Sequence, residues 1–307
     1  MKKNLTLEQQ LKRLKRKFYI LLAGLILFVS ATGVYVYLNY DYLAFKHFIT
    51  SFYIYTGAMD KVFEKELKTD VKGKYYSYFD DLVISVVTKR LREENNDRYT
   101  YLYTPESLKN YLVSEKQEAA QSEITLPNDK TVLLRLTNFS TYTRKFMEDN
   151  YGKLKSRPNL IIDLRDNPGG DIDMMVDISG MFLPKKSIVA TDKMRMLNIV
   201  YKAKGPYALA YESIIILQNK NTASASENLI AALKDNLDNV TLLGEKTFGK
   251  GIGQFTLPLK RGFAVKATIL QWFTPKGINI QGNGIEPDIL QPEGDTLQTA
   301  LDIIDKG

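Results

Sequence analysis

The chain has 307 residues, 44% of them hydrophobic and 25% charged, a composition typical of a globular protein with one large or two small domains. It contains no cysteine and a single histidine, His47. The absence of cysteine excludes a cysteine nucleophile, a disulfide framework and a zinc–thiolate site. His47 lies far upstream of every motif that carries reactive side chains, so a hydrolase built on this chain is expected to use another general base.

The basic charge of the chain is concentrated at its N-terminus. The formal net charge is +7, and residues 1–17 hold seven basic residues against one acidic residue. Residues 18–40 carry no charge, and the remainder holds 35 basic and 34 acidic residues. A nucleic-acid-binding protein carries its basic residues on a folded face. The positive charge here belongs to a tail, and we expect no nucleic-acid partner.

The uncharged segment Phe18–Leu38 has the length of a membrane-spanning helix. As an α-helix its 21 residues extend about 31 Å, the thickness of a bilayer core. The basic tail in front of it follows the positive-inside rule. We expect a cytoplasmic tail (1–17), a single span of the cell membrane (18–40) and an extracytoplasmic remainder. The alternative is a signal peptide cleaved near Ala31, but the apolar run continues past that site.

The pattern after the span changes from helical spacing to an alternation of strands and helices. Helical spacing extends over 41–72 and recurs in 75–112, and the polar segment 114–129 is interpreted as a linker or hairpin. We then expect strands at 132–136, 160–164, 213–218, 240–243, 255–259 and 263–269, and helices at 146–154, 174–181 and 227–235. This alternation predicts an α/β fold with a mostly parallel core. It divides the chain into a helical juxtamembrane or cap region (41–128) and a core (129–307).

Three loops carry the candidate chemistry, and each follows a buried strand, at the sheet edge where α/β proteins bind ligands. In the first, Ser224 stands between a strand and a helix. Its hydroxyl can be exposed there, and the N–H groups at the helix start can stabilise an oxyanion. The alternative is structural, because Ser224-x-x-Glu227 is also the pattern of an N-terminal capping box.

The second loop, GEKTFGKG, is similar to a phosphate-binding P-loop. Gly251 replaces the hydroxyl residue that such a loop needs, and no helix is expected to follow, so an ATPase is not favoured. Lys250 lies between two glycines, which allow the backbone to approach other chain segments closely. Burial lowers the pKa of a lysine from ~10.4 toward neutrality, which makes it a competent base for a serine hydroxyl. The alternative is an ordinary exposed loop lysine.

The third loop contains Gly169 and Gly170. Paired glycines after a strand can present backbone amides to an oxyanion, although the same residues also suit a simple tight turn. The acidic residues nearby lack the spacing of an EF-hand, so no calcium site is expected. Together with the lack of cysteine and the remote histidine, the three loops indicate a Ser–Lys hydrolase.

Four sequence blocks together resemble the carboxyl-terminal processing peptidases, or tail-specific proteases. In chain order they are LIIDLRDNPGGD, NTASASENLIAAL, GEKTFGKGIGQ and FTPKGINIQGNGIEPDI. The resemblance covers about 75–292 and implies a crotonase-like α/β peptidase core. It implies that Ser224 is the nucleophile, that Lys250 is the base and that Gln254 orients the lysine.

The resemblance also implies an oxyanion hole and one departure from the family pattern. The oxyanion amides would be those of Ala225 and of either Gly169 or Gly170, and no cofactor is implied. Family members usually carry a PDZ domain between the helical cap and the core. Here fewer than about 30 residues separate the end of the cap near Glu106 from the core at Val132, too few for such a domain.

The function expected from the sequence is that of a membrane-anchored serine endopeptidase. It would cleave extracytoplasmic proteins or peptides through a Ser–Lys acyl-enzyme mechanism in the core at 129–307. The alternative is a catalytically inactive scaffold of the same fold that binds peptides or protein partners at the membrane. The expected partners are a protein or peptide substrate and the lipid bilayer, through residues 18–40. A homo-oligomer or a regulatory protein partner is compatible with an exposed helix near the membrane.

Overall fold

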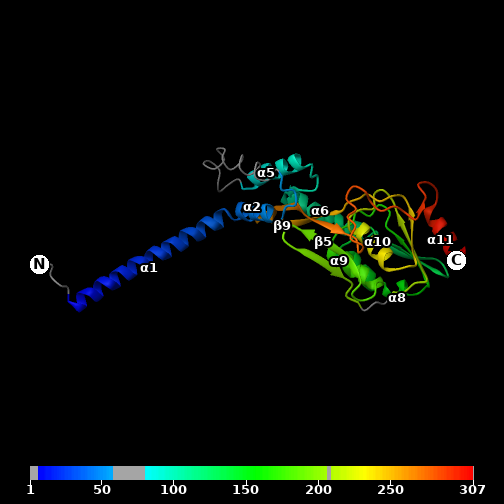
Figure 1. Cartoon of the computed structure of the whole chain (residues 1–307), viewed down its shortest axis with the longest axis horizontal. Helices are drawn as coiled ribbons and strands as arrows, with labels where there is room; N and C mark the ends of the chain where they lie inside the picture. Colours follow the sequence, from blue (N-terminus) through cyan, green and yellow to red (C-terminus); the bar gives the residue numbers. More distant parts are fainter. Residues whose placement is uncertain (1–5, 58–79, 206–208, 307) are drawn as a thin grey trace.

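The computed structural model describes residues 6–57, 80–205 and 209–306. One long N-terminal helix leads to a body built from two sheets and the helices around them (Figure 1). The helices are α1 (Leu7–Leu38), α2 (Tyr40–Phe52), α5 (Asp80–Asn95), α6 (Pro105–Ala119), α7 (Thr141–Asp149), α8 (Tyr151–Leu154), α9 (Ile172–Phe182), α10 (Ala225–Asn236), α11 (Thr296–Lys306) and the 3-10 turn η1 (Lys260–Gly262). The strands are β1 (Tyr101–Tyr103), β2 (Glu123–Asn128), β3 (Thr131–Arg135), β4 (Asn159–Asp163), β5 (Ile188–Met194), β6 (Asn198–Lys202), β7 (Ser213–Gln218), β8 (Val240–Gly244), β9 (Ile252–Pro258), β10 (Ala264–Phe273) and β11 (Ile289–Leu290).

The larger sheet is mostly parallel, as the alternation of strands and helices predicted. Its six strands run in the order β11-β8-β7-β4-β3-β2. Every neighbouring pair is parallel except β2–β3, an antiparallel hairpin at one edge. Parallel strands are covered on both faces, and β4 and β7 are accordingly near-continuous apolar runs. Those runs made both strands predictable from the sequence.

Side chains that alternate along each strand build two cores on the two faces of this sheet. Leu160 and Ile162 of β4 pack with residues of α7, α9 and α10, whereas Ile161 packs on the opposite face with residues of α11. In β7, Ile216 lies on the first face and Ile215 on the second. Helices therefore cover both faces, and the loops after β4 and β7 meet at one edge.

The second sheet is antiparallel, and its strands were predicted from the sequence only in part. It has the strand order β1-β10-β5-β6, with β9 also paired to β10. The segments predicted at 255–259 and 263–269 correspond to β9 and β10, but β5 and β6 were not predicted. β5 mixes buried apolar residues with charged ones, and β6 has only exposed and half-buried residues, so neither strand shows the long buried apolar run of β4 or β7. β1 lies inside a segment predicted as mixed helix; it has only three residues and pairs with β10, with Tyr101 opposite Lys266.

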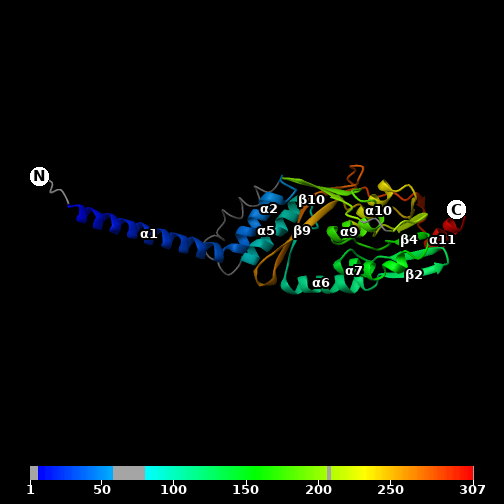
Figure 2. The same cartoon turned by 90° about the horizontal axis from the view of Figure 1, so that it is seen from below.

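The predicted helix at 41–72 is too long within the described residues. α2 ends at Phe52, where Tyr53 takes an extended conformation with φ −60° and ψ 129°, and residues 58–72 lie outside the described part. α2 and α5 pack against β9 and β10, in a core that includes Phe45, Ile84 and Val265. Figure 2 shows this cluster at the end of the body that adjoins α1.

The polar segment at 114–129 is part helix and part hairpin. α6 begins at an N-cap where Thr104 Oγ1 accepts a hydrogen bond from the Ser107 backbone N–H at 3.2 Å, with Pro105 at the first helical position. It continues to Ala119, beyond the predicted start of the linker. β2 then pairs with β3, which confirms the hairpin alternative. This pairing joins residues on both sides of the boundary expected at 128/129.

α1 is one continuous helix of 32 residues with a mean hydropathy of 2.1 in its most apolar window, none of which is buried. Thr6 and Gln9 form a capping box at its start, so the helix includes most of the basic tail. Among the described residues it is the one helix long and apolar enough to cross a membrane, by length and composition.

Candidate active site

Ser224 occupies a sharp turn between β7 and α10. Its backbone has φ 57° and ψ −117°, a conformation that costs a non-glycine residue roughly 1–3 kcal/mol. The turn reverses the chain directly from a buried strand into a helix, and Ser224 is half-buried. Ala225 is the first residue of α10, so its N–H has no intrahelical acceptor. Strain of this kind persists only where the surroundings enforce it.

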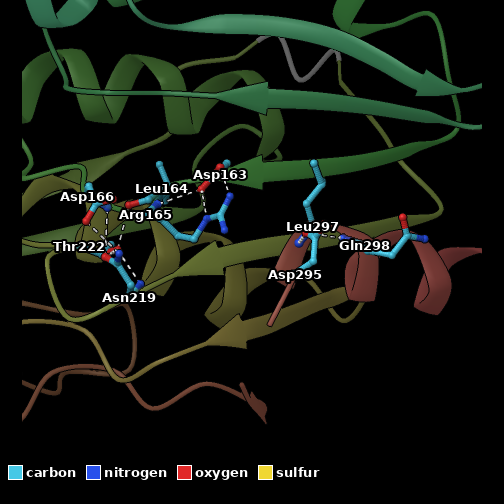
Figure 3. A network of polar contacts seen from close by, with 9 residues as sticks. All are labelled: Asp163, Leu164, Arg165, Asp166, Asn219, Thr222, Asp295, Leu297 and Gln298. Atoms are coloured by element: carbon cyan, nitrogen blue, oxygen red, sulfur yellow. Dashed lines mark hydrogen bonds and ion pairs between the residues drawn. The ribbon is translucent and has the colours of Figure 1, made fainter. Parts of the chain in front are cut away.

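Hydrogen bonds between the loops after β4 and β7 enforce this turn (Figure 3). Asp166 N donates to Asn219 Oδ1 at 3.0 Å, and Asn219 Nδ2 donates back to Asp166 Oδ1 at 2.9 Å. Thr222 Oγ1 donates to the Leu164 carbonyl at 2.8 Å. Hydrogen bonds from Asn221 and Asn219 hold the pKa of Asp166 below its ordinary value. The two loops form one hydrogen-bonded unit in which Asp166 is a charged acceptor.

Gly169 lies against the Ser224 turn so closely that no other residue fits. Its φ is 101°, and a Cβ there would lie 2.8 Å from Ala225 N and 2.9 Å from Ser224 Cβ. The Asn167 carbonyl accepts hydrogen bonds from the Ser226 hydroxyl and from the backbone of the serine loop, both at 3.0 Å. The glycine turn and the serine turn are therefore adjacent. An oxyanion hole built from amides of both turns requires this arrangement.

The hydrogen bonds distinguish the two glycine amides. Gly169 N donates to Asn167 Oδ1 at 3.0 Å, so this amide is engaged. Gly170 forms a parallel bridge with Phe139, whose N–H and C=O bond to the residues on either side of Gly170. The Gly170 N–H itself has no acceptor among the residues that the structure describes. Of the two amides left open by the sequence, that of Gly170 is free to donate.

Glu227 joins the serine loop to the lysine loop. Its side chain is fully buried, and its carboxylate accepts four hydrogen bonds. Oε1 accepts from Thr247 Oγ1 at 2.5 Å and Gly249 N at 2.7 Å. Oε2 accepts from Ser224 N at 2.8 Å and Lys250 N at 2.9 Å. Because both nitrogens bond to one oxygen, they lie no further apart than the sum of these distances, 5.7 Å.

The environment of Lys250 lowers its pKa to about 8. Burial is the main cause, since it disfavours the charged ammonium, and the positive charges of Lys266 and Arg98 add to the effect. The negative charge of Glu227 opposes it. This residue is therefore unlike an ordinary loop lysine, and a useful fraction of it is neutral at neutral pH.

The side chain of Lys250 rests on an aromatic ring. Nζ lies 4.8 Å from the centre of the Tyr99 ring, within the range of a cation–π contact. No hydrogen bond joins Nζ to Ser224 Oγ within the described ranges 6–57, 80–205 and 209–306. The backbones of the two residues are held close together through Glu227, while their reactive atoms are not hydrogen-bonded to each other.

The fourth sequence block holds the lysine loop in place. Asn279 Nδ2 donates to the Gly251 carbonyl at 2.8 Å, and Gly251 N donates to Gln281 Oε1 at 2.8 Å. Gly249 also accepts a hydrogen bond from the Gly282 N–H at 2.9 Å. The chain after this loop enters strand β9 and not a helix, which agrees with the rejection of the P-loop interpretation.

Gln254 lies on β9, directly opposite Thr268 of β10. Its side-chain Nε2 is buried without a hydrogen-bond partner in the part of the chain that the structure describes. Thr268 Oγ1 donates to Asp97 Oδ1 at 3.1 Å, and the charge of Asp97 acts on the pKa of Lys250. Gln254 and Lys250 therefore share a neighbourhood, and the orienting role of Gln254 stays a prediction.

Two residues with a part in this site were not identified from the sequence. Glu227 was interpreted only as a possible capping partner of Ser224, and its bonds to the lysine loop had no sequence signal. Tyr99 lies in the cap segment, where an aromatic residue carries no motif.

The sequence matches of this chain to known proteins all point to the same family of peptidases. A sequence model of peptidase family S41 matches residues 130–291. The Carboxyl-terminal-processing protease of Synechocystis is 34% identical over 215 residues, which cover 66% of this chain and 50% of the relative. A Probable CtpA-like serine protease of Staphylococcus aureus is 36% identical over 156 residues, which cover 47% of this chain and 31% of the relative. The chain thus spans half or less of the length of these relatives.

Solved structures share the fold at low sequence identity. The photosystem II D1 C-terminal processing protease aligns with a TM-score of 0.63 at 18% identity, covering 83% of this chain and 93% of that chain. A lipoprotein from Streptococcus agalactiae aligns with a TM-score of 0.67 at 16% identity, covering 87% and 95%. The arrangement of the two sheets is therefore found in other proteins.

Proposed function

The chain belongs to peptidase family S41, and we propose that it is a membrane-anchored serine endopeptidase that uses a Ser224–Lys250 dyad on extracytoplasmic proteins or peptides. Membership of the family confirms the resemblance seen in the four sequence blocks. The observation that carries the proposal is the buried Glu227 carboxylate, which bonds to the backbone N–H groups of both dyad residues. A capping box alone would not require the second of these bonds.

In the proposed reaction, Ser224 Oγ attacks the carbonyl carbon of a peptide bond while neutral Lys250 Nζ accepts its proton. With a pKa of about 8, about a tenth of the lysine is neutral at pH 7. The ammonium then protonates the leaving amine, and water hydrolyses the acyl-enzyme. The N–H groups of Ala225 and Gly170 would donate to the oxyanion. The lysine side chain must first turn from Tyr99 toward Ser224.

The remaining parts of the proposal concern the anchor and the core. The length and hydropathy of α1 support a single membrane span at 18–40, with residues 1–17 in the cytoplasm and the rest outside. A signal sequence has similar features, and the N-terminal sequence of the mature protein distinguishes the two. We assign residues 41–128 to the cap and 129–307 to a crotonase-like peptidase core. The proposed chemistry uses no cofactor.

A non-catalytic scaffold remains the second candidate, and one observation favours it. Ser224 Oγ and Lys250 Nζ share no hydrogen bond in the described structure. A resting protease also shows loose catalytic geometry, which tightens when substrate binds. The lowered pKa of Lys250 favours the enzyme, because a scaffold has no need of a deprotonated lysine.

The test uses full-length protein in detergent micelles with casein as the substrate. We expect cleavage by the wild type and none by Ser224→Ala or Lys250→Met. Lys246→Met is the matched control, because Lys246 lies in the same loop but is exposed and paired with Glu286. Binding of casein without cleavage by all four proteins would favour the scaffold. Equal cleavage by wild type and Ser224→Ala would refute the assigned site.

A further inference from the structure

Two hairpin turns lie along α2, one near its C-terminal end and the other at its junction with α1. The β9–β10 turn contacts it through Lys260, whose backbone N–H donates to Asp41 Oδ1 at 3.0 Å. Lys260 Nζ also donates to the Tyr37 carbonyl and lies 4.3 Å and 5.5 Å from the ring centres of Tyr37 and Tyr40. Tyr37 and Tyr40 flank the end of α1, where aromatic residues mark the membrane–water interface. The β9–β10 turn is therefore held at the membrane end of the body.

The β5–β6 turn reaches the same end of the body (Figures 1 and 2). Arg195 Nη1 donates to the Thr50 carbonyl of α2 at 2.7 Å, and the turn is closed by a hydrogen bond from Met194 N to the Leu197 carbonyl at 2.9 Å. The tip of this turn exposes apolar side chains, with Met196 73% and Leu197 48% accessible. Two neighbouring large apolar residues at the tip of a turn are suited to an apolar or interfacial environment.

The three segments that form these turns and α2 are rich in basic residues. In the segments 40–57, 193–199 and 257–263, the single acidic residue is Asp41, which is buried and bonded to Lys260. The same segments hold five basic residues: Lys46, Lys193, Arg195, Lys260 and Arg261. A basic surface beside a membrane helix is complementary to anionic lipid headgroups.

We propose that these three segments form a bilayer-facing surface, which rests on anionic lipid and lets Met196 and Leu197 enter the interface. The inference rests on the proposed anchoring by α1, with which the surface is continuous. Its basic side chains contact lipid phosphates, and the apolar tip of the β5–β6 turn lies at headgroup depth. The body is thereby oriented on the membrane, not merely tethered to it.

This orientation limits which substrates the site can reach. Lys250 precedes β9 and Lys260 follows it, ten residues further along the chain. Ten residues of extended chain span at most about 33 Å. The candidate site therefore lies within that distance of the surface, and its substrates are polypeptide segments close to the bilayer, such as the stems of membrane-bound or lipid-anchored proteins.

The experiment uses the lack of native cysteine, which allows single-cysteine labelling of the full chain without background. Met196→Cys, Gln298→Cys and Leu27→Cys are each labelled with an environment-sensitive fluorophore. The proteins are reconstituted in phosphatidylcholine vesicles with or without phosphatidylglycerol. Quenching is measured with nitroxide-labelled lipid and, separately, with aqueous iodide. Gln298 is exposed on α11 at the far end of the body, and Leu27 lies on α1.

We expect the label at 196 to be quenched by nitroxide lipid and shielded from iodide, while the label at 298 shows the reverse. Each basic residue close to an anionic surface raises occupancy roughly fivefold, so quenching at 196 should fall when phosphatidylglycerol is omitted. Quenching at 27 without quenching at 196 overturns the inference and leaves the anchor intact. A label at 196 shielded from iodide but not quenched by lipid also overturns it, because protein then covers the turn. Absence of quenching at 27 refutes the anchor itself.

Discussion

Replacement of Glu227 by Gln is the sharpest test of the link between the serine loop and the lysine loop. The carboxylate presents two acceptor oxygens to four donors, three of them backbone N–H groups. A carboxamide keeps one oxygen and turns an NH₂ group toward the other pair of donors. The Thr247 hydroxyl accepts from Ile285 N at 2.7 Å and has a second lone pair that can accept from the new NH₂ group, but the backbone N–H groups cannot accept. Glu227→Gln therefore loses two charge-assisted hydrogen bonds in a buried site.

The loss of stability in Glu227→Gln follows from the number of hydrogen bonds that are lost. At about 1.5–3 kcal/mol each, two such bonds correspond to a loss of about 3–6 kcal/mol in the free energy of unfolding. The loss falls where Ser224 and Lys250 are positioned, and a displacement of reacting groups by about 1 Å lowers kcat about 100-fold. The negative charge of Glu227 raises the pKa of Lys250. Its removal lowers that pKa, so the acid limb of kcat/KM moves to lower pH.

The assay combines thermal denaturation with the pH dependence of casein cleavage. Glu286→Gln is the control, because Glu286 forms an exposed ion pair with Lys246 at 2.7 Å. Such a pair contributes at most about 1 kcal/mol, so the control should keep the activity and pH profile of the wild type. If Glu227→Gln keeps kcat within a factor of two and leaves the acid limb of the pH profile unshifted, Glu227 does not position the two catalytic loops.

Three further predictions concern single residues of the site. Lys250→Met should raise the free energy of unfolding at pH 7 by about 1–3 kcal/mol. The reason is that burial lowers the pKa of this lysine from 10.5 to about 8, so the folded protein disfavours its charged form. The gain in stability should therefore fade as denaturation is measured from pH 8 toward pH 10.5. Ser224→Gly should be more stable than Ser224→Ala by about 1 kcal/mol in urea denaturation, since glycine relieves the positive φ of 57°; equal stabilities would show that the turn is not strained. Tyr99→Leu removes a cation–π contact of about 0.5–2 kcal/mol that holds Lys250 away from Ser224. The kcat for casein should therefore rise severalfold. A fall in kcat would mean that Tyr99 supports the active geometry.

The parts of the fold that the sequence predicted are those with an unambiguous local signal. β4 and β7 are buried on both faces, so their apolar runs stand out between turn residues. β5 and β6 lie in a sheet with mixed burial, and their sequences mix apolar and charged residues without a clear period. β1 has only three residues and exists because β10 pairs with it. Pairing of that kind depends on tertiary contacts.

In the candidate site, too, the residues with a local sequence signal were predicted and those that depend on tertiary contacts were not. Ser224, Lys250 and the glycine turn were found because each follows a strand in a recognisable motif. The bonds from Glu227 to the lysine loop join residues more than 20 positions apart, and no local pattern encodes them. Asp97 stands in a polar stretch of the sequence, yet it is buried. Its Oδ2 accepts from the Tyr53 hydroxyl at 3.0 Å and from Thr100 Oγ1 at 2.6 Å. A buried polar residue of this kind is indistinguishable from an exposed one until its partners are known.

The central claim is that neutral Lys250 activates Ser224, and the rate of covalent labelling by a fluorophosphonate probe tests it most directly. The rate is followed against pH by mass spectrometry of the full-length protein, with the modified peptide identified. We predict modification at Ser224, a rate that rises with pH around the Lys250 pKa of about 8, and at least a 100-fold slower reaction in Lys250→Met. Labelling at another residue, or labelling of Ser224 at an equal rate in Lys250→Met, would contradict it.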